Sequence, residues 1–129
     1  MKKKYSILIV DDDKFLLEMY KKKFDILGLS PDIAVGPQSA LEKLRTGSTY
    51  DIMVFDIIMP GMDGLELLET IQTEKLSANA IMIMLTNESE STKIEKAKSL
   101  GVKGYIVKAT SVPSEVAQEI LNIADKYTT

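Results

Sequence analysis

Apolar runs of strand length alternate with segments of helical period along the chain. Most of these runs are nearly continuous in aliphatic residues, and they cover residues 6–10, 32–35, 52–55, 80–85 and 104–107. A continuous apolar run is typical of a parallel strand that is covered on both faces, whereas a strand with one solvated face alternates between apolar and polar residues. The pattern therefore predicts a parallel sheet buried between two layers.

The segments between these runs carry apolar residues every three or four positions, as one face of a helix does. Five such segments are marked by Leu16, Leu41, Leu65, Ile94 and Val116. Gly28, Gly47 and Gly101 follow three of them and are expected to end helices, since glycine tolerates the conformation of a helix C-cap. Strand and helix alternate five times. We therefore expect one α/β domain over residues 1–129, a (βα)5 sandwich with right-handed crossovers.

Composition narrows the classes of function. The 129 residues suffice for one well-buried core, and a net charge of -3 argues against a nucleic-acid-binding domain, which usually carries a basic excess. The absence of cysteine and histidine excludes disulfides, zinc sites built on those residues and Ser-His chemistry. The apolar run after the N-terminal lysines ends abruptly at "DDD", unlike a signal peptide, and no run is long enough to span a membrane. We expect a cytoplasmic protein that binds neither nucleic acid nor membrane.

Four predicted strands end at a chemically reactive position. These positions are Asp11 with Asp12, Asp56, Thr86 and Lys108. The carboxyl ends of parallel strands share one edge of a sheet, where open α/β sheets bind ligands. Loops are polar, so a polar residue after a strand is ordinary, but that does not explain three acids, a hydroxyl and an amine without any imidazole. We expect these side chains to converge on one cleft.

Three clustered carboxylates repel one another and lose hydration, which costs free energy or raises a pKa. A hard divalent cation removes this cost, and a site with only oxygen donors favours Mg²⁺. A carboxylate can also attack phosphorus and form an aspartyl phosphate. Lys108 and the Thr86 hydroxyl could then contact the phosphoryl oxygens. The residues alone predict Mg²⁺-dependent phosphoryl transfer to an aspartate.

The motifs "ILIVDDD", "DIMVFDIIMPGMDGLELL", "IMIMLT" and "GYIVK", in this order, resemble the receiver domains of two-component response regulators. The resemblance covers essentially the whole chain and implies a flavodoxin-like fold with strand order 2-1-3-4-5. It implies that Asp56 is the phospho-acceptor and that Asp11, Asp12 and Asp56 hold Mg²⁺ with the backbone carbonyl of Ile58. Thr86 and Lys108 would contact the phosphoryl group.

The resemblance also implies a switch and its partners. Tyr105 matches an aromatic residue that turns inward when Thr86 moves toward the phosphate, and Ile58 and Glu88 occupy two positions that tune dephosphorylation. With the apolar Ile58 we expect a long-lived phosphoryl group. The donor would be a sensor histidine kinase or a histidine phosphotransfer protein. A downstream protein would bind the surface formed by the fourth helix, the fifth strand and the fifth helix. The chain would be a monomer or would form a weak dimer through the same surface.

Two residues depart from the family's commonest pattern. Asn87 stands where a small residue usually follows the threonine, and Ala109 stands where a proline with a cis peptide usually follows the lysine. A non-proline cis bond costs roughly 2.5–4 kcal/mol, so we expect either a strained loop or a different approach of Lys108. These departures keep open a pseudo-receiver, which retains the fold only as a docking module.

Two other classes compete. Asp11-x-Asp13 satisfies the Asp-x-Asp motif of haloacid-dehalogenase-like phosphatases, although the chain is short for that fold and no acidic pair follows Lys108. We instead predict that Asp13 and Asp63 each N-cap a helix. A flavodoxin-like FMN site is disfavoured because "DDDK" would repel the flavin phosphate. The pathway, and whether the chain is a stand-alone receiver or one excised from a longer protein, stay open.

Overall fold

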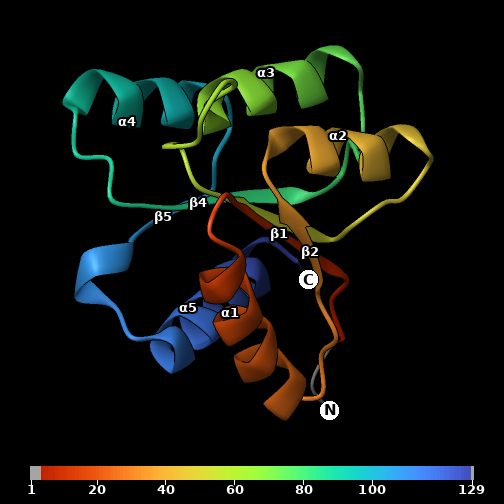
Figure 1. Cartoon of the computed structure of the whole chain (residues 1–129), viewed down its shortest axis with the longest axis vertical. Coiled ribbons are helices and arrows are strands. Elements are labelled where there is room, and N and C mark those ends of the chain that lie inside the picture. Colours follow the sequence, from red (N-terminus) through yellow and green to blue (C-terminus); the bar gives the residue numbers. More distant parts are fainter. Residues whose placement is uncertain (1–3, 129) are drawn as a thin grey trace.

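A computed structural model, which describes residues 4–128, places a parallel five-stranded sheet between two layers of helices (Figure 1). The strands follow the order β2-β1-β3-β4-β5, and every neighbouring pair is parallel. Their bounds are β1 (Ile7–Asp11), β2 (Asp32–Val35), β3 (Ile52–Phe55), β4 (Ile81–Thr86) and β5 (Gly104–Val107). The predicted flavodoxin-like topology is confirmed.

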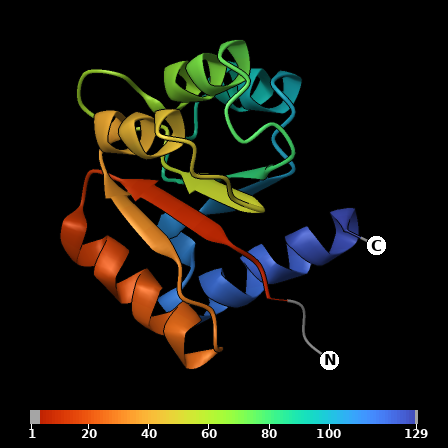
Figure 2. The ribbon, with the colours of Figure 1, turned by 90° about the vertical axis from the view of Figure 1, so that its right-hand side faces the viewer.

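Five α-helices connect and cover the strands. They are α1 (Lys14–Ile26), α2 (Pro37–Arg45), α3 (Gly64–Thr73), α4 (Ser91–Ser99) and α5 (Pro113–Tyr127). Helices α1 and α5 lie on one face of the sheet, and α2, α3 and α4 lie on the other (Figure 2). A short 3-10 helix (Lys108–Thr110), which the sequence pattern did not predict, follows β5. Within the described part of the chain, no helix is both long and apolar enough to cross a membrane.

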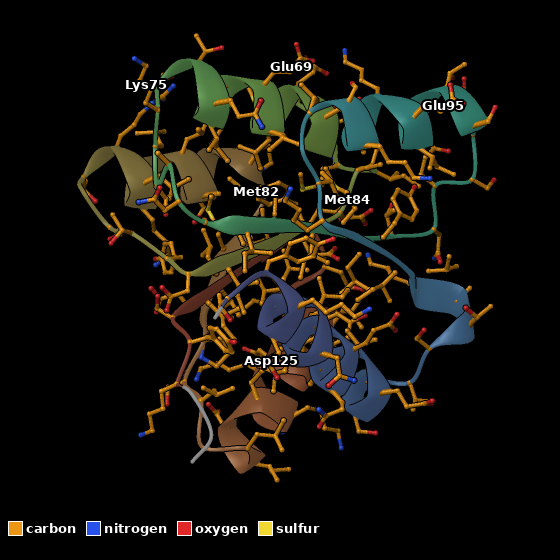
Figure 3. The ribbon with its side chains drawn as sticks, turned by 180° about the vertical axis from the view of Figure 1, so that it is seen from behind. Glu69, Lys75, Met82, Met84, Glu95 and Asp125 are labelled. Carbon is orange, nitrogen blue, oxygen red and sulfur yellow. The ribbon has the colours of Figure 1, made fainter. Side chains whose placement is uncertain are left out.

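The two faces of the sheet bury two separate apolar clusters, and this explains the continuous apolar runs. Leu8 and Val10 of β1 belong to the cluster under α2, α3 and α4, whereas Ile7 and Ile9 belong to the cluster under α1 and α5. Figure 3 shows side chains filling both layers. The edge strands β2 and β5 are only partly buried, which fits their shorter and more mixed sequences.

Two strands begin and end one residue later than the sequence pattern indicated. The pattern placed the first strand at 6–10 and the fourth at 80–85, whereas β1 includes Asp11 and β4 includes Thr86. Asp11 pairs with Val35, and Thr86 pairs with Val107. Backbone pairing does not depend on side-chain polarity, so a polar residue at the end of an apolar run can still belong to the ladder. Two candidate site residues are therefore fixed by the sheet itself.

Both predicted N-caps are confirmed. The Asp13 carboxylate accepts a hydrogen bond from the Leu16 amide at 3.1 Å at the start of α1. Asp63 forms a capping box with Glu66, in which each side chain accepts a hydrogen bond from the other residue's amide. Caps of this kind satisfy amides that the first helical turn leaves unpaired. They fix where α1 and α3 begin, directly beside the carboxyl edge of the sheet.

Candidate phosphoryl and metal site at the carboxyl edge

The register of the sheet brings the predicted site residues to one edge. Val10 pairs with Phe55, so Asp11, the last residue of β1, lies beside Asp56, which directly follows β3. Lys108 directly follows the last paired residue of β5. Parallel strands all expose their carboxyl ends on the same side, and residues distant in sequence meet there. Of the side chains predicted to converge, those of Asp11, Asp56 and Lys108 meet at this edge, and Asp12 offers a carboxylate oxygen to the same cluster. The Thr86 hydroxyl instead accepts a hydrogen bond from the Glu88 amide.

Lys108 joins the two buried carboxylates. Its Nζ lies 2.5 Å from Asp11 Oδ2 and 2.6 Å from Asp56 Oδ2. Asp11 and Asp56 are 2% and 5% exposed, so water solvates them poorly. Each also accepts a backbone hydrogen bond, Asp11 from the amide of Asp13 at 3.1 Å and Asp56 from the amide of Ile58 at 3.0 Å. Both carboxylates are therefore held by one shared ammonium and one amide each.

The pKa values of Asp11 and Lys108 are shifted by burial and by the hydrogen bonds between Lys108 and the two carboxylates. Burial raises the pKa of Asp11 above its usual value, although the hydrogen bond from Lys108 opposes the shift. Burial by itself lowers the pKa of Lys108, but hydrogen bonds to Asp11 and Asp56 outweigh it, and the net pKa is raised. Lys108 therefore stays positively charged at neutral pH.

The donors present fit a hard divalent cation. Asp11, Asp12 and Asp56 each offer a carboxylate oxygen, and these oxygens lie within 4.8 Å of one another. Lys108 bridges Asp11 and Asp56, whereas Asp12 is exposed. One ammonium cannot neutralise three carboxylates, so the cluster carries excess negative charge among oxygen donors only. Such a set matches Mg²⁺ better than a softer metal.

The loop between β4 and α4 connects Thr86 to the neighbouring strand. The Thr86 hydroxyl is fully buried and accepts a hydrogen bond from the Glu88 amide at 3.2 Å. The Tyr105 hydroxyl donates to the Glu88 carbonyl at 2.7 Å. A hydrogen bond from Lys93 lowers the pKa of the Glu88 carboxyl below its usual value. Thr86, Glu88 and Tyr105 are therefore linked in one hydrogen-bonded chain.

One pairing beside the site was not foreseen from the sequence. The Asn87 side-chain oxygen accepts a hydrogen bond from the Ala109 amide at 2.7 Å. The sequence marked both residues as departures but gave no reason to join them. The register of β4 and β5 could have predicted this contact, because both residues lie just beyond the last residue pair, Thr86 with Val107. No peptide bond among the described residues is cis, so Lys108 approaches the carboxylates through a trans loop and a turn of 3-10 helix.

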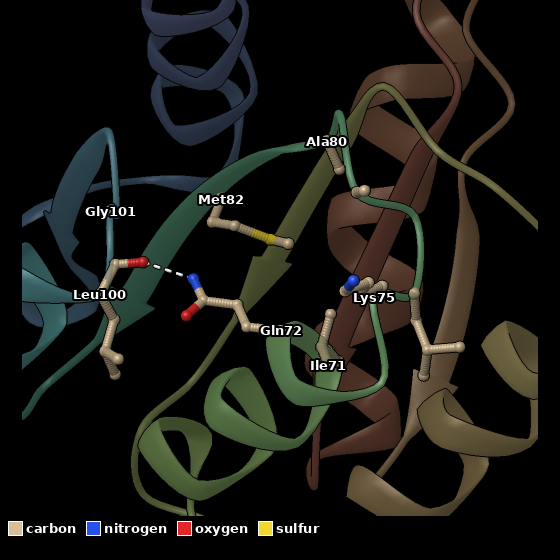
Figure 4. Close-up of a pocket in the computed structure, with 9 residues that line it drawn as sticks. Ile71, Gln72, Lys75, Ala80, Met82, Leu100 and Gly101 are labelled. Atoms are coloured by element: carbon tan, nitrogen blue, oxygen red, sulfur yellow. Dashed lines mark hydrogen bonds between the residues drawn. The ribbon is translucent and has the colours of Figure 1, made fainter.

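A separate hollow of about 280 Å³ lies near the amino end of β4, away from these carboxylates (Figure 4). Its lining is mainly apolar and includes Ile71, Met82 and Leu100. The Gln72 side chain donates a hydrogen bond to the Leu100 carbonyl across it. It lacks the cluster of reactive groups that the carboxyl edge holds, so the carboxyl edge is the candidate site.

Known proteins share the sequence pattern and the fold of this chain. A family model described as the response regulator receiver domain matches residues 7–120. The chain is 35% identical over 109 residues to the chemotaxis protein CheY-3 of Vibrio cholerae, covering 84% of this chain and 83% of that protein. It is 32% identical over 111 residues to the chemotaxis protein CheY of Halobacterium salinarum, covering 84% and 88%. The crystal structure of a CheY-like receiver domain protein from Methanospirillum hungatei superposes with a TM-score of 0.83 at 27% identity, covering 98% of this chain and all of that one.

Proposed function

This chain belongs to the response regulator receiver domain family, and from that premise we propose that it is a phospho-acceptor switch. Asp56 takes a phosphoryl group from the phosphohistidine of a sensor kinase or a histidine phosphotransfer protein in a Mg²⁺-dependent reaction. The observation that carries the proposal is the shared ion pair, in which Lys108 Nζ contacts both Asp11 and Asp56 at the carboxyl edge. A partly buried amine between two buried acids at the ends of adjacent strands has no evident use in packing alone.

The proposed chemistry uses groups that already face one another. An Asp56 carboxylate oxygen attacks phosphorus, a new O–P bond forms, and the N–P bond of the donor breaks with its electron pair returning to the donor's imidazole. Lys108 supplies a fixed positive charge beside the phosphoryl oxygens, and the Thr86 hydroxyl donates a hydrogen bond to one of them. Mg²⁺, when held by the three aspartates and the Ile58 carbonyl, would add positive charge at the same oxygens. The Ile58 amide orients the Asp56 carboxylate.

The proposed switch begins at Thr86. If its hydroxyl turns to the phosphoryl group, its bond to the Glu88 amide is lost and the loop that also holds Tyr105 must rearrange. A local change in charge would thereby alter the surface of α4, β5 and α5, where a downstream protein binds. The Ile58 side chain is exposed beside the site and apolar, so it cannot orient a water for hydrolysis, and we expect slow loss of the phosphoryl group.

The test is phosphorylation by a small-molecule donor, followed by intact-protein mass spectrometry. We expect acetyl phosphate with Mg²⁺ to add one phosphoryl group, and chelation of Mg²⁺ or the change Asp56→Asn to abolish the addition. Asp51→Asn is the matched control, because Asp51 is an exposed aspartate just before β3, the strand that Asp56 follows.

Three results would overturn the proposal. The first is a mass increase that survives Asp56→Asn but not Asp51→Asn. The second is no covalent phosphoryl in any condition, which would leave a docking module with the receiver fold. The third is sustained turnover of a phosphate ester, which would indicate a phosphatase. The Asp13 carboxylate already caps the start of α1. This argues against a phosphatase, because the Asp-x-Asp motif would need the same carboxylate for catalysis.

A further inference from the structure

The pairing of β4 and β5 continues one step beyond the sheet through a side chain. The last residue pair is Thr86 with Val107. Just past it, the side-chain oxygen of Asn87 accepts the hydrogen bond from the Ala109 amide at 2.7 Å, a short distance for an N–H···O bond. A side chain here takes the place of the strand carbonyl that would extend a backbone ladder.

The two residues that form this hydrogen bond are each next in sequence to a site residue, Thr86 or Lys108. The amide that donates it belongs to the peptide between Lys108 and Ala109, so the bond restrains the plane of that peptide. Lys108 lies on one side of the bond and reaches Asp11 and Asp56, and Thr86 directly precedes Asn87 on the other side. The donor exists only because residue 109 is not proline, which has no amide hydrogen.

We propose that Asn87 is a positioning residue, whose side chain ties the Lys108–Ala109 peptide to the end of β4 so that Thr86 and Lys108 meet the phosphoryl group as one unit. This inference rests on the proposed function. Asn87 and Ala109 are both exposed, so water replaces the bond at little cost to folding. The contribution of Asn87 therefore shows in the rate of phosphoryl transfer, where a small displacement of the amine matters, rather than in stability.

The first experiment compares Asn87→Ala with Asn122→Ala. Asn122 is an exposed asparagine on α5 whose side-chain oxygen also accepts a hydrogen bond, from Gln118, so the control removes the same kind of bond within a helix that contributes no residue to the site. We expect Asn87→Ala to lower the maximal rate of phosphorylation by acetyl phosphate roughly 2- to 10-fold, the range of one hydrogen bond. The unfolding midpoint should stay at the control value, and hydrogen exchange of the Ala109 amide should become faster.

The second experiment removes the donor instead of the acceptor. In an Ala109→Pro background the bond is already absent, so adding Asn87→Ala should cause no further loss of rate. An equal loss in both backgrounds would show that Asn87 acts by another route and would overturn the inference. Asn87→Asp, which keeps an acceptor oxygen, should retain slow exchange of the Ala109 amide.

Failure of the inference can be told apart from failure of the proposed function. If the wild-type protein accepts no phosphoryl group, the proposed function fails and the positioning role fails with it. If the wild type is phosphorylated on Asp56 and Asn87→Ala reacts as fast as Asn122→Ala, only the inference about Asn87 fails. A rate loss that merely follows a loss of stability would also count against it.

Discussion

The carboxylates of this protein outnumber the positive charges that face them. Lys108 contacts Asp11 and Asp56, but Asp12 adds a third carboxylate within the same cluster. Without a cation the cluster is held together by one ammonium and a few amides, and repulsion among the acids opposes folding. This excess of negative charge suits the proposed binding of a cation and a phosphoryl group, and it does not favour maximal stability.

Asp12→Asn should relieve this repulsion. Because the side chain is exposed, we expect the free energy of unfolding without metal to rise by only about 0.2–1 kcal/mol, the range of exposed charge interactions. The added stability that Mg²⁺ confers through binding to the folded state should shrink or disappear. Urea unfolding with and without Mg²⁺ measures both effects.

Glu119→Gln on α5 serves as the control, since it also removes one exposed negative charge but lies outside the cluster. Its response to Mg²⁺ should match the wild type. If Asp12→Asn kept the full Mg²⁺ stabilisation, Asp12 would not be a ligand, and the metal site would have to be reassigned to the remaining acids.

The start of helix α3 packs closely against the backbone of Asp56 and Ile57. A Cβ atom added to Gly64 would come 2.1 Å from the Asp56 carbonyl oxygen and 2.8 Å from the Ile57 Cα, both of them backbone atoms. The Gly64 amide also donates to the Ile57 carbonyl at 2.8 Å. Helix α3 therefore begins in direct backbone contact with the loop that carries the candidate phospho-acceptor, and only glycine fits there.

Gly64→Ala should consequently lower both stability and phosphorylation. We expect a loss of about 1–3 kcal/mol in the free energy of unfolding, as for other overpacked sites, because backbone must move to make room. Gly104→Ala is the matched change: its Cβ would come 2.5 Å from Ile123 Cδ1, the end of a flexible side chain that can turn away. Gly64→Ala should lose more stability in denaturant unfolding and more of its phosphorylation rate than Gly104→Ala. Equal losses in the two variants would contradict a specific need for glycine at position 64.

Two hydrogen-bonded links cross from the β4 end toward β5 and its following loop. One joins Glu88 to Tyr105, and the other joins Asn87 to Ala109. Both start within two residues of Thr86. A movement of Thr86, as the proposed switch requires, would therefore reach β5 through short local contacts, and α1 in the opposite layer would not need to move.

Binding of beryllofluoride with Mg²⁺, a mimic of the phosphoryl group, should reveal this spread. We expect amide chemical shifts in NMR spectra to change at Asp56 and Thr86, through the β4–α4 loop and at Tyr105, with smaller changes in the middle of α1. Asp56→Asn should abolish them. Changes confined to the immediate neighbours of Asp56 would contradict a switch, and no metal-dependent change at all would remove the basis for the phospho-acceptor.

Much of the fold was predictable from local patterns. Continuous apolar runs indicated strands covered on both faces, and the three-to-four spacing indicated the helices, because burial on a sheet or a helix face demands that spacing. Asp13 and Asp63 were predictable as N-caps from their place before helical segments. The convergence of Asp11, Asp56 and Lys108 followed from parallel topology, which puts all strand ends on one edge.

The contacts between these side chains were not predictable in this way. They depend on the register of the strands and on side-chain rotamers. Examples are the sharing of Lys108 by Asp11 and Asp56, the hydrogen bond from Tyr105 to the Glu88 carbonyl, and the hydrogen bond between Asn87 and Ala109. Even the inclusion of Asp11 and Thr86 in their strands rests on backbone pairing with neighbours far away in sequence. The chain encodes which residues reach the edge through periodicity and order, which are local properties. The contacts between side chains at that edge depend on packing between elements. These contacts form only once the sheet has formed.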